Sequence, residues 1–135
     1  MKTNIRKYID EDFDQLVNLL HDDDLGKSRE SIDEKSNSNY LKAISEITTN
    51  DNFDIYVMTD EASDRLIGCF QIMFLPHVSF QGMRRCQVES VRVRSDLRGK
   101  GLGTELIKYA INLSKKKGCG IFAVSYTHLT LPTIA

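Results

Sequence analysis

The chain has 135 residues, of which 41% are hydrophobic and 27% charged, and its formal net charge is −1. These values are typical of one soluble domain with a hydrophobic core, and they argue against a disordered or fibrous protein. No apolar run approaches the roughly 20 residues that a membrane-spanning helix needs, so we expect no membrane partner.

The cysteines and histidines indicate in which cellular compartment the protein lies and whether it binds a metal. Three widely spaced cysteines lie in apolar segments: Cys69, Cys86 and Cys119. An odd number at such spacing indicates free thiols, and the first residues hold no apolar run typical of a secretion signal, so we expect a cytoplasmic protein. The three histidines share no ligand-like spacing, and we expect no metal site.

Charge is distributed unevenly along the chain. Residues 1–80 carry 8 Lys and Arg against 16 Asp and Glu, a net charge of −8, whereas residues 81–135 carry 10 against 3, a net charge of +7. A basic half favours an anionic partner, although basic residues that merely solvate a helix face would give the same count.

The first half of the chain predicts a strand followed by two helices. Residues 4–9 (NIRKYI) form a short strand, and residues 10–20 form a helix with an acidic first turn and an apolar face. Residues 21–39 are polar and predict a long loop or a broken helix. A second helix is expected over residues 40–48 (YLKAISEIT).

Three strands follow, at residues 51–60, 66–75 and 86–93, with a connection over residues 76–85. Residues 66–75 (LIGCFQIMFL) are apolar on both faces, which predicts a central strand. The last of these strands changes phase: Cys86 and Val88 share one face by the period of two, whereas Val91 and Val93 fall on the other. A phase change at Glu89 predicts a β-bulge, a feature often found beside active sites.

Residues 104–118 (TELIKYAINLSKKKG) are the clearest helix, with a stripe of four apolar residues and a closing Gly118. The predicted stripe is Leu106, Ile107, Ala110 and Ile111. A buried strand over residues 119–126 (CGIFAVSY) follows. The predicted order is β-α-α-β-β-β-α-β, and the fold class is α+β, or mixed α/β.

Three glycines precede this helix in the run RGKGLG, residues 98–103. Backbone N–H groups at a helix start lack intrahelical partners and bind phosphate, and glycines let a ligand approach them closely. The run does not match the P-loop, which needs G-x-x-x-x-G-K-[ST], and its G-x-G-x-G spacing differs from the dinucleotide fingerprint. The loop is therefore a candidate pyrophosphate site of another kind.

The run Arg98-Gly99-Lys100-Gly101-Leu102-Gly103 resembles the R/Q-x-x-G-x-G/A signature of the GNAT acetyltransferase superfamily. The order of elements also resembles that fold, over residues 5 to about 124. The segments HDDDLGKSRE and QGMRRCQVESVRV resemble a bacterial subgroup of uncertain substrate. The resemblance implies a GNAT-like acyl-CoA N-acyltransferase fold, acetyl-CoA as co-substrate and, for the full-length protein, a homodimer.

The resemblance also assigns the cofactor-binding residues. The pantetheine arm would lie against main-chain groups of Val91, Arg92 and Val93, in a gap between this strand and the next. The pyrophosphate would bind the backbone of the signature loop: Arg98, Gly99, Lys100, Gly101, Leu102, Gly103 and Thr104.

Glu89 is the candidate catalytic base, since direct attack on a thioester needs a neutral amine. It lies at the phase change, where family members use a glutamate or a nearby group for this role. Alternatively, Glu89 forms an ion pair with Arg84 or Arg85, and Ser90 is a weaker candidate that would orient a water.

The acceptor is expected to be a small-molecule amine, held by residues 21–31 and 76–85. The run Asp22–Asp24 suits a cationic acceptor, whereas Arg29 and Arg84 suit an acidic one. The sequence does not choose between them.

The last 18 residues, from Gly118 on, carry no Asp, Glu, Lys or Arg. A GNAT domain continues after this strand with a helix, which often bears the tyrosine that acts as general acid, and with further strands. We therefore expect residues 1–124 to be an incomplete GNAT-like domain that is weakly active. Residues 125–135 resemble the translation of a sequencing adapter and are expected to be a non-native tail, so Tyr126 is not assigned as the acid.

Two other functions remain open: a non-catalytic acyl-CoA-binding regulatory module, and a small basic nucleic-acid-binding protein. The second lacks the aromatic residues and motifs typical of such proteins, so we expect no nucleic-acid partner. The sequence favours transfer of an acetyl group from acetyl-CoA to a primary amine.

Overall fold

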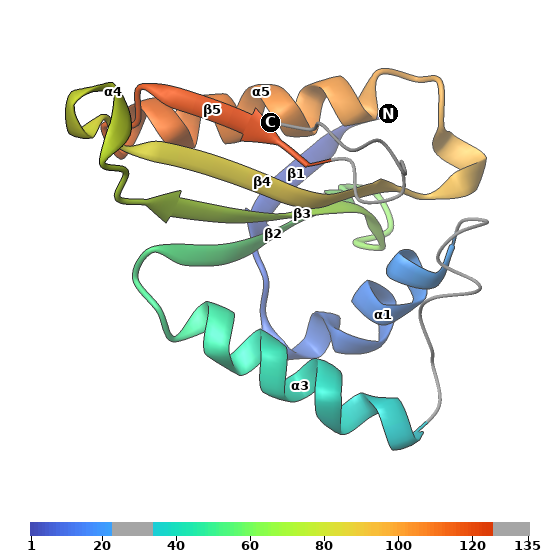
Figure 1. Cartoon of the computed structure of the whole chain (residues 1–135). Helices are drawn as coiled ribbons and strands as arrows, with labels where there is room; N and C mark the ends of the chain where they lie inside the picture. Colours follow the sequence, from blue (N-terminus) through green and yellow to red (C-terminus); the bar gives the residue numbers. More distant parts are fainter. Residues whose placement is uncertain (23–33, 126–135) are drawn as a thin grey trace.

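The computed structural model describes residues 1–22 and 34–125 and contains one five-stranded sheet. The strands lie side by side in chain order, the first four antiparallel and the last pair parallel (Figure 1). They are β1 (Thr3–Lys7), β2 (Phe53–Asp60), β3 (Leu66–Leu75), β4 (Arg85–Val93) and β5 (Ile121–Val124).

Helices cover both faces of this sheet, which gives three layers (Figure 1). α1 (Phe13–His21), which follows the short helix η1 (Asp10–Asp12), and α3 (Glu34–Thr48) lie on one face. α5 (Leu102–Lys116) lies on the other. The one-turn helix α4 (Ser79–Gly82) joins β3 to β4, and η2 (Ser95–Leu97) leads from β4 toward α5. The mixed α+β architecture and the expected order of the main elements are confirmed.

The larger core lies between the sheet and α5. Its most buried side chains include Met58, Phe70, Ile72, Val88, Leu106 and Ala110. α5 buries Leu102, Leu106, Ala110 and Ser114, a row with a spacing of four residues. The predicted stripe is therefore half wrong: Ile107 and Ile111 are only partly buried, and Tyr109 and Leu113 pack against the larger core in their place.

A smaller core lies between the sheet and α1, and it includes Leu16, Leu19, Val57 and Cys69. α3 adds only partly buried side chains to this core, among them Ile44. α3 begins at Glu34, six residues before the predicted start at residue 40. Its first turns are polar in sequence, so no apolar period could have indicated them.

The predicted β-bulge in β4 is confirmed. Gln71 pairs with Glu89 and Cys69 pairs with Arg92, so two residues of β4 lie opposite Phe70 alone. One of the two, Ser90, has a φ of 54°, a left-handed conformation that costs free energy in a residue with a side chain.

Within the described residues, no helix is both long enough and apolar enough to cross a membrane. The three cysteines are free thiols, as expected; Cys69 and Cys86 are buried, whereas Cys119 is half-buried.

We expect Leu106→Ala to lower the free energy of unfolding by about 2–5 kcal/mol, because it removes a fully buried side chain from the larger core. Asn112→Ala, on the exposed side of the same helix, should change that free energy by less than about 0.5 kcal/mol. Urea unfolding of both variants measures the difference, and equal losses would contradict this description of the core.

Candidate functional site

The glycine-rich loop joins β4 to α5 and depends on a left-handed backbone at Gly101. Gly101 is the residue before the first turn of α5 and has a φ of 81°. A Cβ placed there would meet no other atom within 4 Å, so the position faces open space. The chain therefore needs glycine at this position for its backbone conformation and not because of crowding.

The start of α5 leaves several backbone N–H groups without helical partners. The first intrahelical bond runs from the N–H of Glu105 to the carbonyl of Gly101, at 3.1 Å. The amides of residues 102–104 therefore point out of the helix start, where the helix dipole favours a negative charge. A hollow of about 310 Å³ lies against them. Its lining includes Val93, Arg98, Gly99, Gly101, Gly103 and Thr104. An anionic group such as a pyrophosphate fits this donor set.

A second hollow, of about 340 Å³, continues from the first toward β5. It shares Gly103 and Thr104 with the first hollow and reaches Val91 on β4 and Val124 on β5. Together the two hollows run from the helix start along β4 to the space between the last two strands.

The described pairing of the last two strands covers only the first part of β4. β5 pairs with β4 from Arg85 to Val88, and a last hydrogen bond of 2.8 Å joins the N–H of Ser125 to the carbonyl of Val88. β4 continues to Val93, and residues 89–93 have no partner in β5 within the described part of the chain. Within the described residues, the main-chain groups of β4 beyond Val88 therefore have no partner in β5 along the second hollow, and the expected gap stays a prediction.

Glu89 lies where this pairing ends. Its direct partner in β3 is Gln71, so the two side chains share the face of the sheet that α1 and α3 cover. Glu89 is half-buried. Among the described residues its carboxylate has no basic partner. Arg84 instead donates a hydrogen bond of 2.7 Å to Asn52, so the expected alternative of an ion pair with Arg84 is not formed.

Cys69 lies beside the bulge, and its thiol donates a 3.5 Å hydrogen bond to the carbonyl of Ser90. Burial raises the pKa of Cys69 to about 12. The thiol is therefore protonated at neutral pH, and the thiolate that a covalent acyl-enzyme would require is absent at this position.

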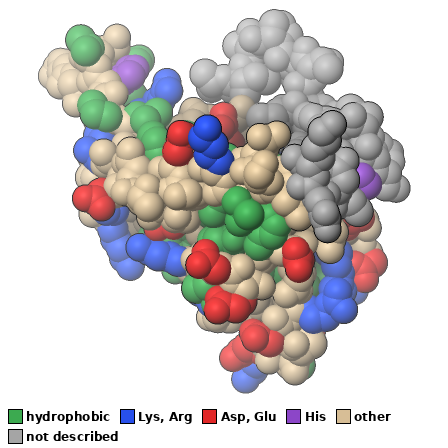
Figure 2. Space-filling view, turned by 90° about the horizontal axis from the view of Figure 1, so that it is seen from below, with side chains coloured by type: hydrophobic (Ala, Val, Ile, Leu, Met, Phe, Trp, Pro, Cys, Tyr) green, Lys and Arg blue, Asp and Glu red, His purple; other side chains and the backbone are tan. Residues whose placement is uncertain are grey.

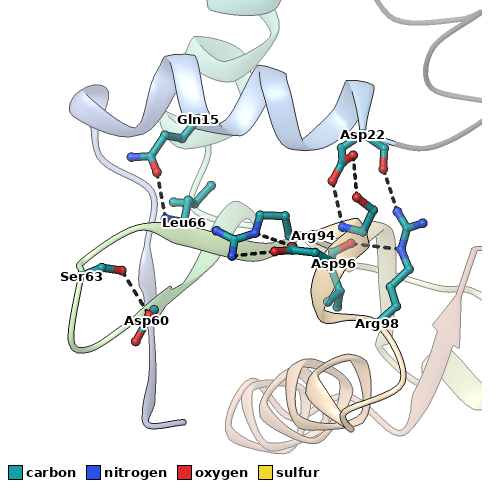
Figure 3. Close-up of polar contacts among 10 residues, drawn as sticks. Gln15, Asp22, Asp60, Ser63, Leu66, Arg94, Asp96 and Arg98 are labelled. Atoms are coloured by element: carbon teal, nitrogen blue, oxygen red, sulfur yellow. Dashed lines mark hydrogen bonds and ion pairs between the residues drawn. The ribbon is translucent and has the colours of Figure 1, made fainter.

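Arg98 contacts the chain itself with its guanidinium group. Its Nε donates to the carbonyl of Val93 at 3.2 Å, and its Nη2 donates to the carbonyl of Asp22 at 2.7 Å (Figure 3). The Asp22 carboxylate accepts hydrogen bonds from the backbone N–H and the hydroxyl of Ser95, at 2.8 and 2.9 Å. These bonds tie the end of α1 to the loop that carries the glycines.

The remaining predicted residues do not lie together at one place in the structure. Arg92 is buried, with 6% of its surface exposed, and it lies opposite Cys69, on the face covered by α1. Lys100 is exposed on the loop. Asp23, Asp24, Arg29 and Tyr126 lie outside the described residues. The sequence did not indicate the contact between Ser95 and Asp22, and it assigned Asp22 only to binding of the acceptor amine. Residues 73 positions apart leave no local pattern that would reveal such a contact.

The chain matches the acetyltransferase (GNAT) family over residues 13–132. It is 31% identical to a transcriptional regulator from Bacillus halodurans C-125, covering 92% of this chain and 81% of that one, with a TM-score of 0.86. It shares its fold with glucosamine-6-phosphate N-acetyltransferase from Arabidopsis thaliana, at 19% identity, coverage of 100% and 96%, and a TM-score of 0.71.

It also shares its fold with a predicted acetyltransferase from Clostridium acetobutylicum, solved with acetyl-CoA, at 15% identity, coverage of 91% and 80%, and a TM-score of 0.71. A search of curated protein sequences finds no significant match. The family match covers most of the sequence and agrees with the glycine loop and the bulge described above. The chain belongs to the GNAT family of acetyltransferases, which use acetyl-CoA.

Proposed function

We propose that the chain transfers the acetyl group of acetyl-CoA to a primary amine of a small molecule. Acetyl-CoA supplies the acyl group as an activated thioester. The observation that carries the proposal is that the two hollows adjoin, from the amides at the start of α5 to Val91 on β4, close to Glu89 in the chain.

The chain's own backbone does most of the cofactor binding in this proposal. The amides of Arg98 to Thr104 hold the pyrophosphate at the positive end of the α5 dipole. The main-chain groups of Val91, Arg92 and Val93, which lack a β5 partner among the described residues, bind the pantetheine arm by hydrogen bonds. The support is the shape of the two hollows and their shared lining at Gly103 and Thr104.

Glu89 acts as the general base in the proposed reaction. An amine acceptor is largely protonated at neutral pH, and only its neutral form has the lone pair that attacks a carbonyl carbon. The Glu89 carboxylate accepts the proton, directly or through a water, and the nitrogen then attacks the acetyl carbonyl. The high pKa of Cys69 supports direct attack in place of an acyl-cysteine.

Two observations support a small-molecule acceptor and a cytoplasmic location. By its name, the Arabidopsis enzyme of the same fold acetylates a small amino sugar phosphate, which favours a small-molecule acceptor here. The free cysteines are typical of a reducing compartment, which favours the cytoplasm.

A second candidate is a regulatory module that binds an acyl-CoA without catalysis. The relative from Bacillus halodurans, 31% identical to this chain, is called a transcriptional regulator. Both functions predict binding of acetyl-CoA, but only the enzymatic one predicts turnover that depends on Glu89.

We expect Gly101→Ala to raise the dissociation constant for acetyl-CoA about tenfold, because the left-handed backbone at this position disfavours a residue with a Cβ by about 1–2 kcal/mol. Gly118→Ala is the matched control, since Gly118 has a similar φ of 73° at the other end of α5. Calorimetric titration with acetyl-CoA measures both variants. A similar loss of affinity in the control would contradict the assignment of the loop.

We expect Asp22→Ala to weaken acetyl-CoA binding about fivefold and to accelerate amide hydrogen exchange at Ser95, because two hydrogen bonds from Ser95 lose their acceptor. Asp14→Ala, on the exposed side of α1, should change neither. Exchange followed by NMR and titration calorimetry test this. Unchanged exchange at Ser95 in the Asp22 variant would show that the contact does not hold the loop.

We expect Glu89→Gln to lower kcat about 100-fold at neutral pH with little change in acetyl-CoA affinity, because the amide cannot accept the proton. The deficit should shrink at high pH, where more of the amine is already neutral. Glu46→Gln, exposed on α3, is the control. A pH profile that is the same for the Glu89 variant and the unaltered protein would remove Glu89 from the mechanism.

A further inference from the structure

A separate hollow of about 110 Å³ lies between α1, α3 and the sheet, on the face opposite α5. Its walls are aliphatic and aromatic, and they include Leu16, Leu20, Ile44 and Ile47. Figure 2 shows this side of the molecule, where hydrophobic side chains gather near the centre with charged side chains around them. Ligand sites are typically concave and lined mostly by apolar side chains with a few polar groups, and this hollow has that character.

α3 borders this hollow with side chains that are not fully buried. Ile44 and Ile47 reach the smaller core but are only partly buried against it, and Ala43, which also borders the hollow, is exposed. Apolar walls of this kind favour an apolar ligand.

The hollow ends at the bulge in β4. Gln71 and Ser90 form its polar end. Gln71 is the direct partner of Glu89 across the strands, so the candidate base lies on the same face of the sheet, next to that end of the hollow. Ser90, which has a left-handed φ, lies where the hollow meets the bulge. Strained backbone of this kind is concentrated at functional sites.

The lining also restricts the chemistry of an occupant. None of the described residues that line the hollow is charged, so a second ammonium group or a phosphate on the acceptor would be buried there without an opposite charge, at high cost. The volume is smaller than the roughly 150 Å³ of a cavity that holds benzene. A branched aliphatic group of about four or five carbons fits these limits.

We propose that this hollow binds the apolar part of the acceptor, and that the acceptor is an aliphatic primary amine whose nitrogen lies at Glu89. The inference rests on the proposed acetyl transfer and names its substrate class. The ammonium group first gives one proton to Glu89, and the C–N bond then forms as the thioester C–S bond breaks. The second proton of the nitrogen passes to the departing sulfur, and coenzyme A leaves as the thiol.

The test is a series of alkylamines of similar basicity: ethylamine, butylamine and 3-methylbutylamine. We expect kcat/KM with acetyl-CoA to rise at least tenfold from ethylamine to 3-methylbutylamine, because each methylene that enters an apolar pocket adds to binding. Ala43→Leu, which fills the hollow, should abolish this rise. Lys42→Leu, an exposed position on the same helix that does not line the hollow, should preserve it.

Ile47→Ala provides a second variant in case Ala43→Leu does not fold, as judged by thermal unfolding. It enlarges the hollow, so the preferred amine should become longer than 3-methylbutylamine. A flat series, or the same series in the Ala43 and Lys42 variants, would overturn the proposed substrate class.

Binding measured by NMR separates this inference from the proposed function. Addition of 3-methylbutylamine should shift the methyl signals of Ile44 and Ile47 and the amide signal of Ser90. Shifts at these residues without acetylation of any amine would support the pocket and overturn the proposed reaction. Acetylation of amines without such shifts would support the reaction and overturn the pocket.

Discussion

The bulge at Ser90 is the constraint on which the site depends. The extra residue lets Val88 and Val91 both face α5, although they lie three positions apart. Within the described residues, pairing with β5 reaches only Val88, just before this point. In a regular strand Glu89 and Val91 would share one face, so one of them would be turned to the wrong side of the sheet. The left-handed backbone at Ser90 is the local free-energy cost of this arrangement.

The contact between Asp22 and the segment after β4 connects the two sides of the sheet. Ser95 and Arg98 belong to the segment that leads to the glycines, whereas Asp22 ends the helix that forms one wall of the apolar hollow. All of these hydrogen bonds have Asp22 as their acceptor. Movement of the end of α1 would therefore displace the segment that leads to the start of α5. In the proposed function, this contact fixes the cofactor side relative to the acceptor side.

Local patterns predicted the part of the molecule from β4 to α5. The phase change at Glu89 predicted the bulge, and the glycine run before an amphipathic helix predicted an open helix start. The start of α3 was missed because its first turns are polar. Ile107 was expected in the core because the sequence alone does not show whether Ile107 or Tyr109 faces the sheet beside Leu106 and Ala110. The side chain of Arg98 could not be placed, since its acceptors are backbone carbonyls of Val93 and Asp22, which any residues would supply.

The positive charge of the second half of the chain does not explain the candidate anion site. Arg94 pairs with Asp96 at 2.7 Å, and Lys117 lies over the ring of Phe74, 5.5 Å from its centroid. Of the basic residues described in that half, only Arg98 and Lys108 line the two hollows, and Arg98 directs its hydrogen bonds to backbone carbonyls. Recognition of a pyrophosphate at this loop would therefore depend on backbone N–H groups and the helix dipole. A count of charged residues cannot reveal such a site, but a run of glycines before a helix can indicate one.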